Sequence, residues 1–195
     1  MRHQASLDAD YFEQMFRDTP DPWGFETRAY EQAKYAQTLA ALGDRRFDRA
    51  LEIGCANGVL TAQLAPYCER LLAIDVSQTA LDLARARCSR LPQVTFERIE
   101  FPRQTPADSA FDLLLLSEVA YYWDDCDLQR AADWIASAVI TGGELLLVHW
   151  TGETDYPQSG DGAVQKLHAM LAERIVLVQA DRQPEYRLDL WRMGA

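Results

Sequence analysis

The sequence predicts an α/β protein built on a doubly wound sheet of seven strands, mostly parallel, with an antiparallel C-terminal edge strand. Between residues 44 and 150, short apolar runs alternate with helix-length segments. One run, 111–118, is apolar along most of its length, as expected for a strand buried on both faces. Such alternation favours right-handed crossovers and parallel strands. Two later runs, 173–179 and 186–193, are separated by a short turn and therefore predict an antiparallel hairpin.

Apolar spacing, glycine and proline set the expected helices and strands in order. Residues 8–42 are expected to form two helices, interrupted at TPDPWG by Pro20 and Pro22. After residue 43 we expect strands at 50–53, 71–75, 94–99, 111–118 and 144–150, and helices at 59–67, 78–89 and 128–139. Apolar residues recur at helical spacing over 78–89. Gly142 and Gly143 are expected to turn the chain into the strand at 144–150.

Composition and charge limit the classes of ligand. The chain has 195 residues, enough for one well-buried core and too few for two ordinary domains. Its formal net charge of −11 argues against a nucleic-acid partner and favours a neutral or cationic small-molecule substrate. The four cysteines form no CxxC pair, which argues against a bound metal. With no apolar leader and no stretch near the ~18 apolar residues of a membrane span, we expect a cytoplasmic protein without a membrane partner.

A glycine-containing turn, LEIGCANGVLT at 51–61, follows the first expected strand. Glycine lets a ligand approach the backbone, and this turn is a usual ligand site in an open α/β sheet. The turn lacks the G-x-G-x-x-G spacing of dinucleotide-binding proteins, because Ala56 and Val59 occupy two of the glycine places. It also lacks the lysine of a phosphate-binding loop. The ligand is therefore expected to carry no phosphate.

The next expected strand ends at Asp75, whose carboxylate offers paired acceptors to the hydroxyls of a ribose. S-adenosyl-L-methionine is a nucleoside with a ribose and a charged tail but no phosphate. Glu52, Gly54, Gly58 and Asp75 resemble the motif E/D-x-G-x-G-x-G and the following acid of the class I methyltransferases, which use this cofactor. Ala56 stands where many relatives carry glycine. The resemblance implies a Rossmann-like fold and S-adenosyl-L-homocysteine as the product.

The resemblance covers most of the chain. FDLLLLSEVAYYW and GGELLLV are similar to strand motifs of these enzymes, and DPWGF, YEQAKYAQTLAAL and YRLDLW resemble the nodulation N-methyltransferase (NodS) group. In that group the acceptor is the free amine of a deacetylated glucosamine on a chitin oligosaccharide, which implies N-methylation of an amino sugar or a similar amine. It also implies one domain over 1–195, with a helical lid at 1–43, a cofactor-binding core at 44–150, and a substrate loop, a helix and C-terminal strands at 151–195.

The resemblance assigns expected roles around the glycine turn. Gly54 and Gly58 leave room for the methionine and ribose portions of the cofactor, Glu52 orients the turn, and Asp75 binds the ribose hydroxyls. The other expected cofactor contacts are Tyr11, Trp23, Lys34, Cys55, Ala56, Val76, Ile99, Glu100 and Ser117. In the lid, aromatic faces can attract the sulfonium cation and Lys34 can meet the methionine carboxylate.

Glu118 and His149 end adjacent expected strands on the cofactor side and are the candidate catalytic residues. An amine must be neutral to attack, so a nearby proton acceptor helps. Tyr121, Tyr122 and Trp150 crowd the same rim and are candidate substrate contacts. Other roles stay open: Glu118 can hold a lid helix or the cofactor's amino group, and His149 can be a hydrogen-bonded strand-end residue.

Three other functions also stay open. A small-molecule O-methyltransferase has the same cofactor motifs. A non-catalytic protein that binds S-adenosylmethionine or its product would keep them too. A dinucleotide oxidoreductase is disfavoured by the missing glycines. Oligomeric state is not indicated by any pattern in the chain.

Overall fold

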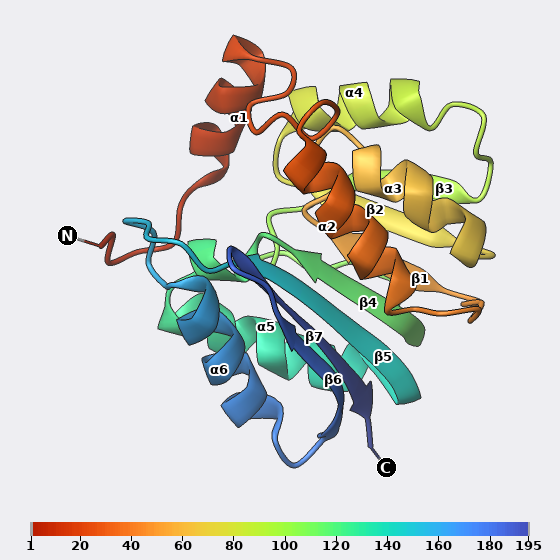
Figure 1. Ribbon diagram of the computed structural model, residues 1–195, viewed down its shortest axis with the longest axis vertical. Coiled ribbons are helices and arrows are strands. Elements are labelled where there is room, and N and C mark those ends of the chain that lie inside the picture. Colours follow the sequence, from red (N-terminus) through yellow and green to blue (C-terminus); the bar gives the residue numbers. More distant parts are fainter. Residues whose placement is uncertain (1, 195) are drawn as a thin grey trace.

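A seven-stranded sheet with helices on both faces forms the centre of the fold (Figure 1). The structure is a computed structural model that describes residues 2–194. Its strands are β1 (Ala50–Ile53), β2 (Leu71–Asp75), β3 (Val94–Arg98), β4 (Phe111–Ser117), β5 (Val139–Trp150), β6 (Ile175–Arg182) and β7 (Tyr186–Met193). Its helices are α1 (Ala9–Asp18), α2 (Ala29–Ala40), α3 (Val59–Leu64), α4 (Gln78–Arg87), α5 (Asp125–Ala138) and α6 (Gly160–Leu171), with short 3-10 helices η1 (Ala65–Tyr67) and η2 (Ala120–Tyr122).

The strand order is β3-β2-β1-β4-β5-β7-β6. Strands β1 to β5 run parallel to one another, and β7 is antiparallel to both β5 and β6. This confirms the predicted Rossmann-like, mostly parallel sheet; the last strand in the chain, β7, lies one place inside the edge, which β6 forms. The chain order reverses between β1 and β4, and in such sheets ligands bind beyond the strand ends at that point.

Alternation along the strands separates two cores. Leu114 and Leu116 of β4 pack with α5 and α6, whereas Leu113 and Leu115 pack on the other face with residues of α2 and α3. Figure 1 shows α5 and α6 on one side of the sheet and α2, α3 and α4 on the other. The central strands, β4 among them, are thus covered on both faces, which explains the continuous apolar run in β4.

Two boundaries differ from the sequence prediction for local reasons. Helix α5 begins three residues before the expected 128, because the Asp124 side chain accepts a hydrogen bond from Asp127 N and caps the helix. Strand β5 begins at Val139 rather than at 144. Gly142 and Gly143 lie within it, next to an irregularity in its pairing with β4, rather than in a turn before it.

Helix α1 is joined to α4 through one carboxylate. Glu13 accepts hydrogen bonds from Ser77 Oγ (2.8 Å), Thr79 Oγ1 (2.8 Å) and Thr79 N (3.2 Å) at the start of α4. Desolvation opposes ionisation of Glu13, but these hydrogen bonds and Arg17 outweigh it and lower the pKa of Glu13 to about 2. The bonds place α1 beside the carboxyl ends of the parallel strands.

Candidate functional site

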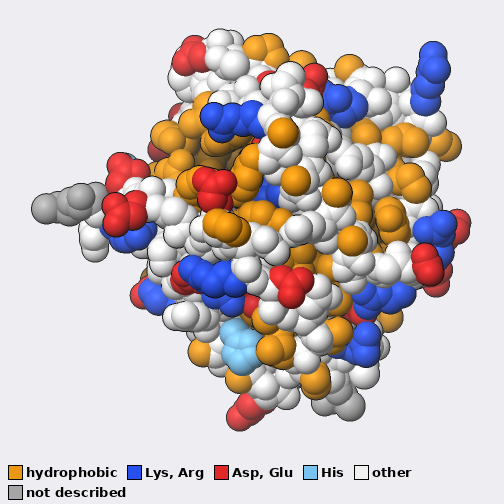
Figure 2. Space-filling model, in the orientation of Figure 1, with side chains coloured by type: hydrophobic (Ala, Val, Ile, Leu, Met, Phe, Trp, Pro, Cys, Tyr) orange, Lys and Arg blue, Asp and Glu red, His pale blue; other side chains and the backbone are white. Residues whose placement is uncertain are grey.

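A cavity of about 660 Å³ lies at the carboxyl ends of β1, β2, β4 and β5. Helix α1, the segment before α2 and the first turns of α2 contribute the facing wall. Figure 2 shows a hollow surrounded by hydrophobic side chains, with basic and acidic side chains beside it. The volume is within the range that holds one cofactor-sized ligand with a compact partner.

The glycine turn forms one wall of this cavity. Gly54 has a φ of +81°, and a Cβ at this position would lie 2.2 Å from Val119 Cγ1. Only glycine therefore fits between β1 and the segment after β4. Gly58, with a φ of +78°, lies outside the lining and meets α4: a Cβ there would be 2.9 Å from Ala84 Cα. Gly54 thus shapes the cavity, while Gly58 permits close packing of two helices.

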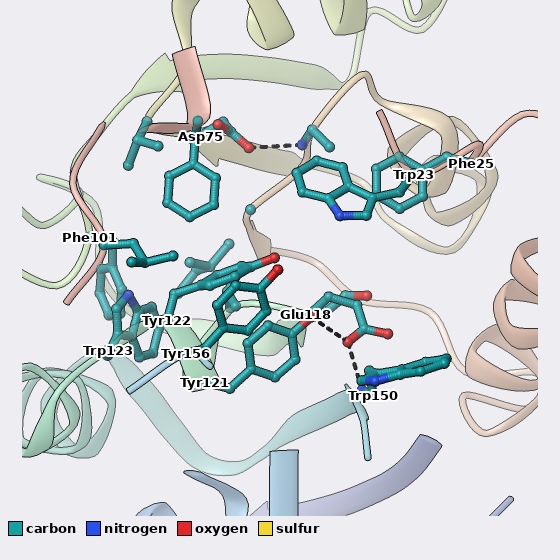
Figure 3. A pocket seen from close by; sticks show the side chains of 18 of the residues that line it. Trp23, Phe25, Asp75, Phe101, Glu118, Tyr121, Tyr122, Trp123, Trp150 and Tyr156 are labelled. Carbon is teal, nitrogen blue, oxygen red and sulfur yellow. Dashed lines mark hydrogen bonds between the residues drawn. The ribbon is translucent and has the colours of Figure 1, made fainter. Parts of the chain in front are cut away.

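Asp75 holds a buried carboxylate at the end of β2 (Figure 3). Its Oδ2 accepts a hydrogen bond from Ala56 N and its Oδ1 accepts one from Ser77 N, both at 2.9 Å. Burial raises the pKa of Asp75, although hydrogen bonds from backbone N–H groups oppose the shift. The carboxylate is therefore oriented by the backbone at the edge of the cavity, with Val76 beside it in the lining.

Glu118 follows β4 and is fixed by three donors. Its Oε1 accepts from Lys34 Nζ at 2.5 Å, and its Oε2 accepts from Tyr121 Oη at 2.8 Å and from Trp150 N at 2.7 Å. The backbone of Glu118 has a φ of +59°, which is uncommon for a residue other than glycine. These contacts hold a carboxylate at the point where β4, β5 and α2 meet.

Lys34 is 2% exposed and lies between two carboxylates. Its Nζ is 2.9 Å from Glu31 Oε2 as well as 2.5 Å from Glu118 Oε1. Burial alone would lower the pKa of Lys34, but Glu118 and Glu31 outweigh it and raise that pKa. Lys34 is therefore a buried cation whose charge is balanced by protein carboxylates.

Aromatic rings line much of the remaining wall. Tyr121 stacks on Tyr156 with ring centroids 5.5 Å apart, and Trp23 stacks on Phe25 with centroids 5.4 Å apart. In Figure 3, Asp75 and Trp23 lie on one side of the cavity, and the tyrosines and Trp150 lie on the other. The cavity thus has a carboxylate at each side and flat apolar surfaces between them.

His149 is fully buried and lies outside the cavity lining. Its Nε2 accepts a hydrogen bond from Ala120 N at 3.1 Å, which holds the start of η2. Burial lowers the pKa of His149 to about 4, so the ring is neutral at neutral pH. Side chains alternate along a strand, so Trp150, the next residue, points to the side that holds α2, with its ring 5.9 Å from that of Tyr30.

The cavity brings together thirteen of the residues singled out from the sequence: Trp23, Lys34, Gly54, Ala56, Asp75, Val76, Ile99, Glu100, Ser117, Glu118, Tyr121, Tyr122 and Trp150. It does not bring in Tyr11, Glu52, Cys55, Gly58 or His149. Tyr11 is 40% exposed on α1, and Glu52 is buried inside the sheet, where desolvation raises its pKa to about 7.

Several lining residues were not singled out from the sequence. Arg28 and Glu31 flank the start of α2, and Tyr156 and Glu185 come from the C-terminal part of the chain. Glu31 lies three residues before Lys34, a helical spacing that indicates an ion pair and could have identified it. Arg28 carries no comparable signal in the sequence.

The described part of the chain, residues 2–194, contains neither a metal-binding cluster nor a helix suited to crossing a membrane. No group of three or more His, Cys, Asp or Glu side chains in this part of the chain is arranged to hold a metal ion. None of its helices combines the length and apolar character needed to cross a membrane.

Comparison with known sequences identifies the family of this chain. Residues 9–148 match the family model of Nodulation protein S (NodS). Nodulation protein S of Bradyrhizobium diazoefficiens is 38% identical over 113 residues, which are 57% of this chain and 54% of that protein. Nodulation protein S of Rhizobium tropici is 33% identical over 65% of this chain and 53% of that protein. The matched region thus spans about half the length of these curated relatives.

Solved structures give similar folds. The crystal structure of N-methyltransferase NodS from Bradyrhizobium japonicum WM9, in complex with S-adenosyl-L-homocysteine, has a TM-score of 0.81 and 24% identity, and the match covers 96% of this chain and 98% of that one. A methyltransferase candidate from Pseudomonas syringae has a TM-score of 0.69 and 39% identity over 85% of this chain and 99% of that one.

Proposed function

Because this chain belongs to the nodulation protein S (NodS) family, we propose that it is an S-adenosylmethionine-dependent methyltransferase that methylates an amine of a small molecule. The observation that carries the proposal is the cavity at the switch point of the sheet. It combines a wall formed by Gly54 with the oriented carboxylate of Asp75, and the turn at 51–61 contains no lysine or arginine of its own to bind a phosphate.

Residues of the cavity lining are suited to the ribose, the adenine and the methionine portion of the cofactor. Asp75 would accept hydrogen bonds from the ribose hydroxyls, and Val76 and Ile99 would pack against the adenine. Gly54 lines the cavity without a side chain and would let the methionine portion approach the backbone. When bound, the cofactor supplies a methyl group carried on a cationic sulfur. The similar NodS structure, which contains S-adenosyl-L-homocysteine, supports this assignment.

Arg28 is a better partner for the cofactor's carboxylate than Lys34. The ammonium of Lys34 is already compensated by Glu31 and Glu118. Arg28 lines the same wall, and its one side-chain hydrogen bond among residues 2–194 is a long one, 3.5 Å from Nη1 to Trp23 O. A guanidinium can bind a carboxylate through two parallel hydrogen bonds.

The acceptor would enter where the aromatic residues gather. Tyr121, Tyr156 and Trp150 offer flat surfaces to a sugar ring or another flat group, and Glu118 places negative charge beside them. A free amine, as on a deacetylated glucosamine of a chitin oligosaccharide, suits this combination. Alignment of the reactants and exclusion of water would then supply much of the rate.

Calorimetric titration tests the cofactor assignment. We expect micromolar binding of S-adenosylmethionine and S-adenosylhomocysteine to the purified protein and no binding of NADH. Release of S-adenosylhomocysteine is then measured with glucosamine and the fully deacetylated chitin disaccharide, with glucose as the hydroxyl control. Turnover with the amines and none with glucose supports the proposal; turnover with glucose would reassign the reaction to oxygen. Binding without turnover for any acceptor would indicate a sensor instead.

A further inference from the structure

Two polar groups on the cavity wall lack hydrogen-bond partners. Tyr30 Oη and Glu31 Oε2 are buried, and neither has a hydrogen-bond partner among residues 2–194. Both residues line the cavity from the first turn of α2, and Glu31 is only 6% exposed. Buried polar atoms in native proteins nearly always have a partner. This turn of α2 therefore has unused acceptor capacity beside the cavity, which a ligand group that brings donors can use.

The surrounding charges favour a cation. The positive charges at this part of the cavity are Lys34 and Arg28. The negative charges are Glu31, Glu118 and Glu185, so the cluster has a net charge of −1. Both oxygens of Glu118 are already occupied by donors of the protein. Glu31, by contrast, meets one donor among residues 2–194, the Lys34 ammonium 2.9 Å from its Oε2. Glu31 is thus the carboxylate in the cluster that remains open to a further donor.

The position of this pair separates it from the ribose end of the cavity. The ring of Tyr30 lies 5.9 Å from that of Trp150, at the end of β5, and 6.0 Å from that of Tyr186, at the start of β7. Asp75 ends β2, three strands away from β5 in the sheet order, or about 14 Å at the usual strand spacing. Figure 3 shows Asp75 and Trp150 on opposite sides of the cavity.

We propose that Tyr30 and Glu31 form the amine subsite for the methyl acceptor, and that Glu31 accepts the proton that the acceptor's ammonium group must lose. The proposal rests on the proposed methyltransferase function. An ammonium group carries several N–H donors, enough for both Glu31 and Tyr30 Oη, and it restores neutrality to the cluster. The faces of Tyr30 and Trp150 add a favourable surface for a cation. A hydroxyl acceptor has one donor and leaves the negative charge uncompensated.

The assigned step is a single proton transfer. One N–H bond of the ammonium breaks, its electron pair stays on nitrogen as the lone pair needed for attack, and the proton forms an O–H bond with the Glu31 carboxylate. Burial raises the pKa of Glu31, although Lys34 opposes the shift, so the carboxylate is a better proton acceptor than it would be in water. Solvent takes the proton from Glu31 after turnover.

A binding experiment tests the subsite. Benzylammonium and its neutral counterpart benzyl alcohol are titrated into the protein saturated with S-adenosylhomocysteine. We expect wild-type protein to prefer benzylammonium, and Glu31→Gln to bind it at least tenfold more weakly, with a smaller loss for Tyr30→Phe. Glu173→Gln, an exposed residue outside the cavity, makes the same charge change and should behave as wild type. All variants should bind S-adenosylhomocysteine normally.

Each other outcome has a distinct meaning. Unchanged benzylammonium affinity in Glu31→Gln, with normal S-adenosylhomocysteine binding, overturns the subsite alone. Weaker S-adenosylhomocysteine binding in Glu31→Gln also overturns it, because Glu31 would then hold the cofactor's own ammonium. Wild-type protein that does not bind S-adenosylhomocysteine overturns the proposed function, and this subsite with it.

The pH dependence of turnover tests the proton transfer. With glucosamine, Glu31→Gln should lose about 10²-fold or more in kcat/KM at neutral pH, the usual range for a lost general base. Its activity should recover as rising pH makes the amine neutral in solution. A Glu31→Gln profile that parallels the wild-type profile would overturn the proton-accepting role, since a merely structural loss would not change the shape of the curve.

Discussion

The ammonium of Lys34 lies 2.5 Å from the Glu118 carboxylate and links the middle of α2 to the end of β4. Glu118 in turn accepts hydrogen bonds from Tyr121 and from the backbone of Trp150. One buried ion pair therefore connects a helix of the N-terminal segment with two strands of the sheet.

Lys34→Met should destabilise the protein by about 3–5 kcal/mol, because it leaves the buried Glu31 carboxylate and the partly buried Glu118 carboxylate without their cation. Urea unfolding measures the change. The control is Lys166→Met, which removes an exposed ion pair with Asp125 and should change stability by only about 0–1 kcal/mol. Equal effects of the two substitutions would contradict a structural role for the buried pair.

Asp75→Asn should weaken S-adenosylhomocysteine binding by about 1.5–3 kcal/mol, because it removes the charge from the proposed acceptor of the ribose hydroxyls. Calorimetry measures the affinity. Asp133→Asn, on the exposed face of α5, is the matched control and should bind normally. Normal binding by Asp75→Asn would mean that the ribose is held elsewhere.

Arg28→Gln should weaken S-adenosylhomocysteine binding by about 1.5–3 kcal/mol, the usual contribution of a hydrogen bond to a charged group. Binding of 5′-methylthioadenosine, which lacks the amino-acid portion, should stay the same. Fluorescence or calorimetric titration with both ligands separates the two effects. An equal loss for both ligands would show that Arg28 acts through the shape of the cavity instead of through the carboxylate.

Glu13→Gln should lower stability at neutral pH by about 0.5–2 kcal/mol, the usual range for a lost helix cap. The folded-state pKa of Glu13, about 2, is below its ordinary value of 4.5. The ionised side chain therefore stabilises the fold fully above about pH 4.5, and this contribution is lost as the pH falls through about 2. Thermal unfolding across that range should show wild type and variant converging in acid. A constant difference at every pH would contradict the assignment.

Much of the sheet could be predicted from the sequence, because its evidence is local. The apolar run of β4 and the glycine at Gly54 follow from burial on two faces and from a backbone with positive φ. Each of these two features depends on a few residues that are neighbours in the sequence. The same locality explains why Asp75, at the end of a strand, could be expected beside the glycine turn.

The facing wall of the cavity could not be predicted in the same way. Arg28 and Glu31 reach the cavity only because α2 packs over the strand ends, and that depends on contacts between segments far apart in the chain. His149 was placed in the site because it lies at a strand end. Its side chain, however, points away from α2, because side chains alternate between the two faces of a strand. The alternation of side chains along the strand would have predicted that His149 and Trp150 point to opposite faces of the sheet.

The order of the strands assigns the two proposed ligands to different parts of the molecule. The residues proposed for the adenosine lie at the ends of β2 and β3, whereas Tyr30, Trp150 and Glu185 belong to α2 and to the β5 and β7 side. A mutant library confined to the first turn of α2 and to residues 151–159 is therefore expected to change which amines are accepted while retaining the cofactor. The range of amines that the protein accepts should therefore be open to engineering without changes to the residues proposed for the adenosine.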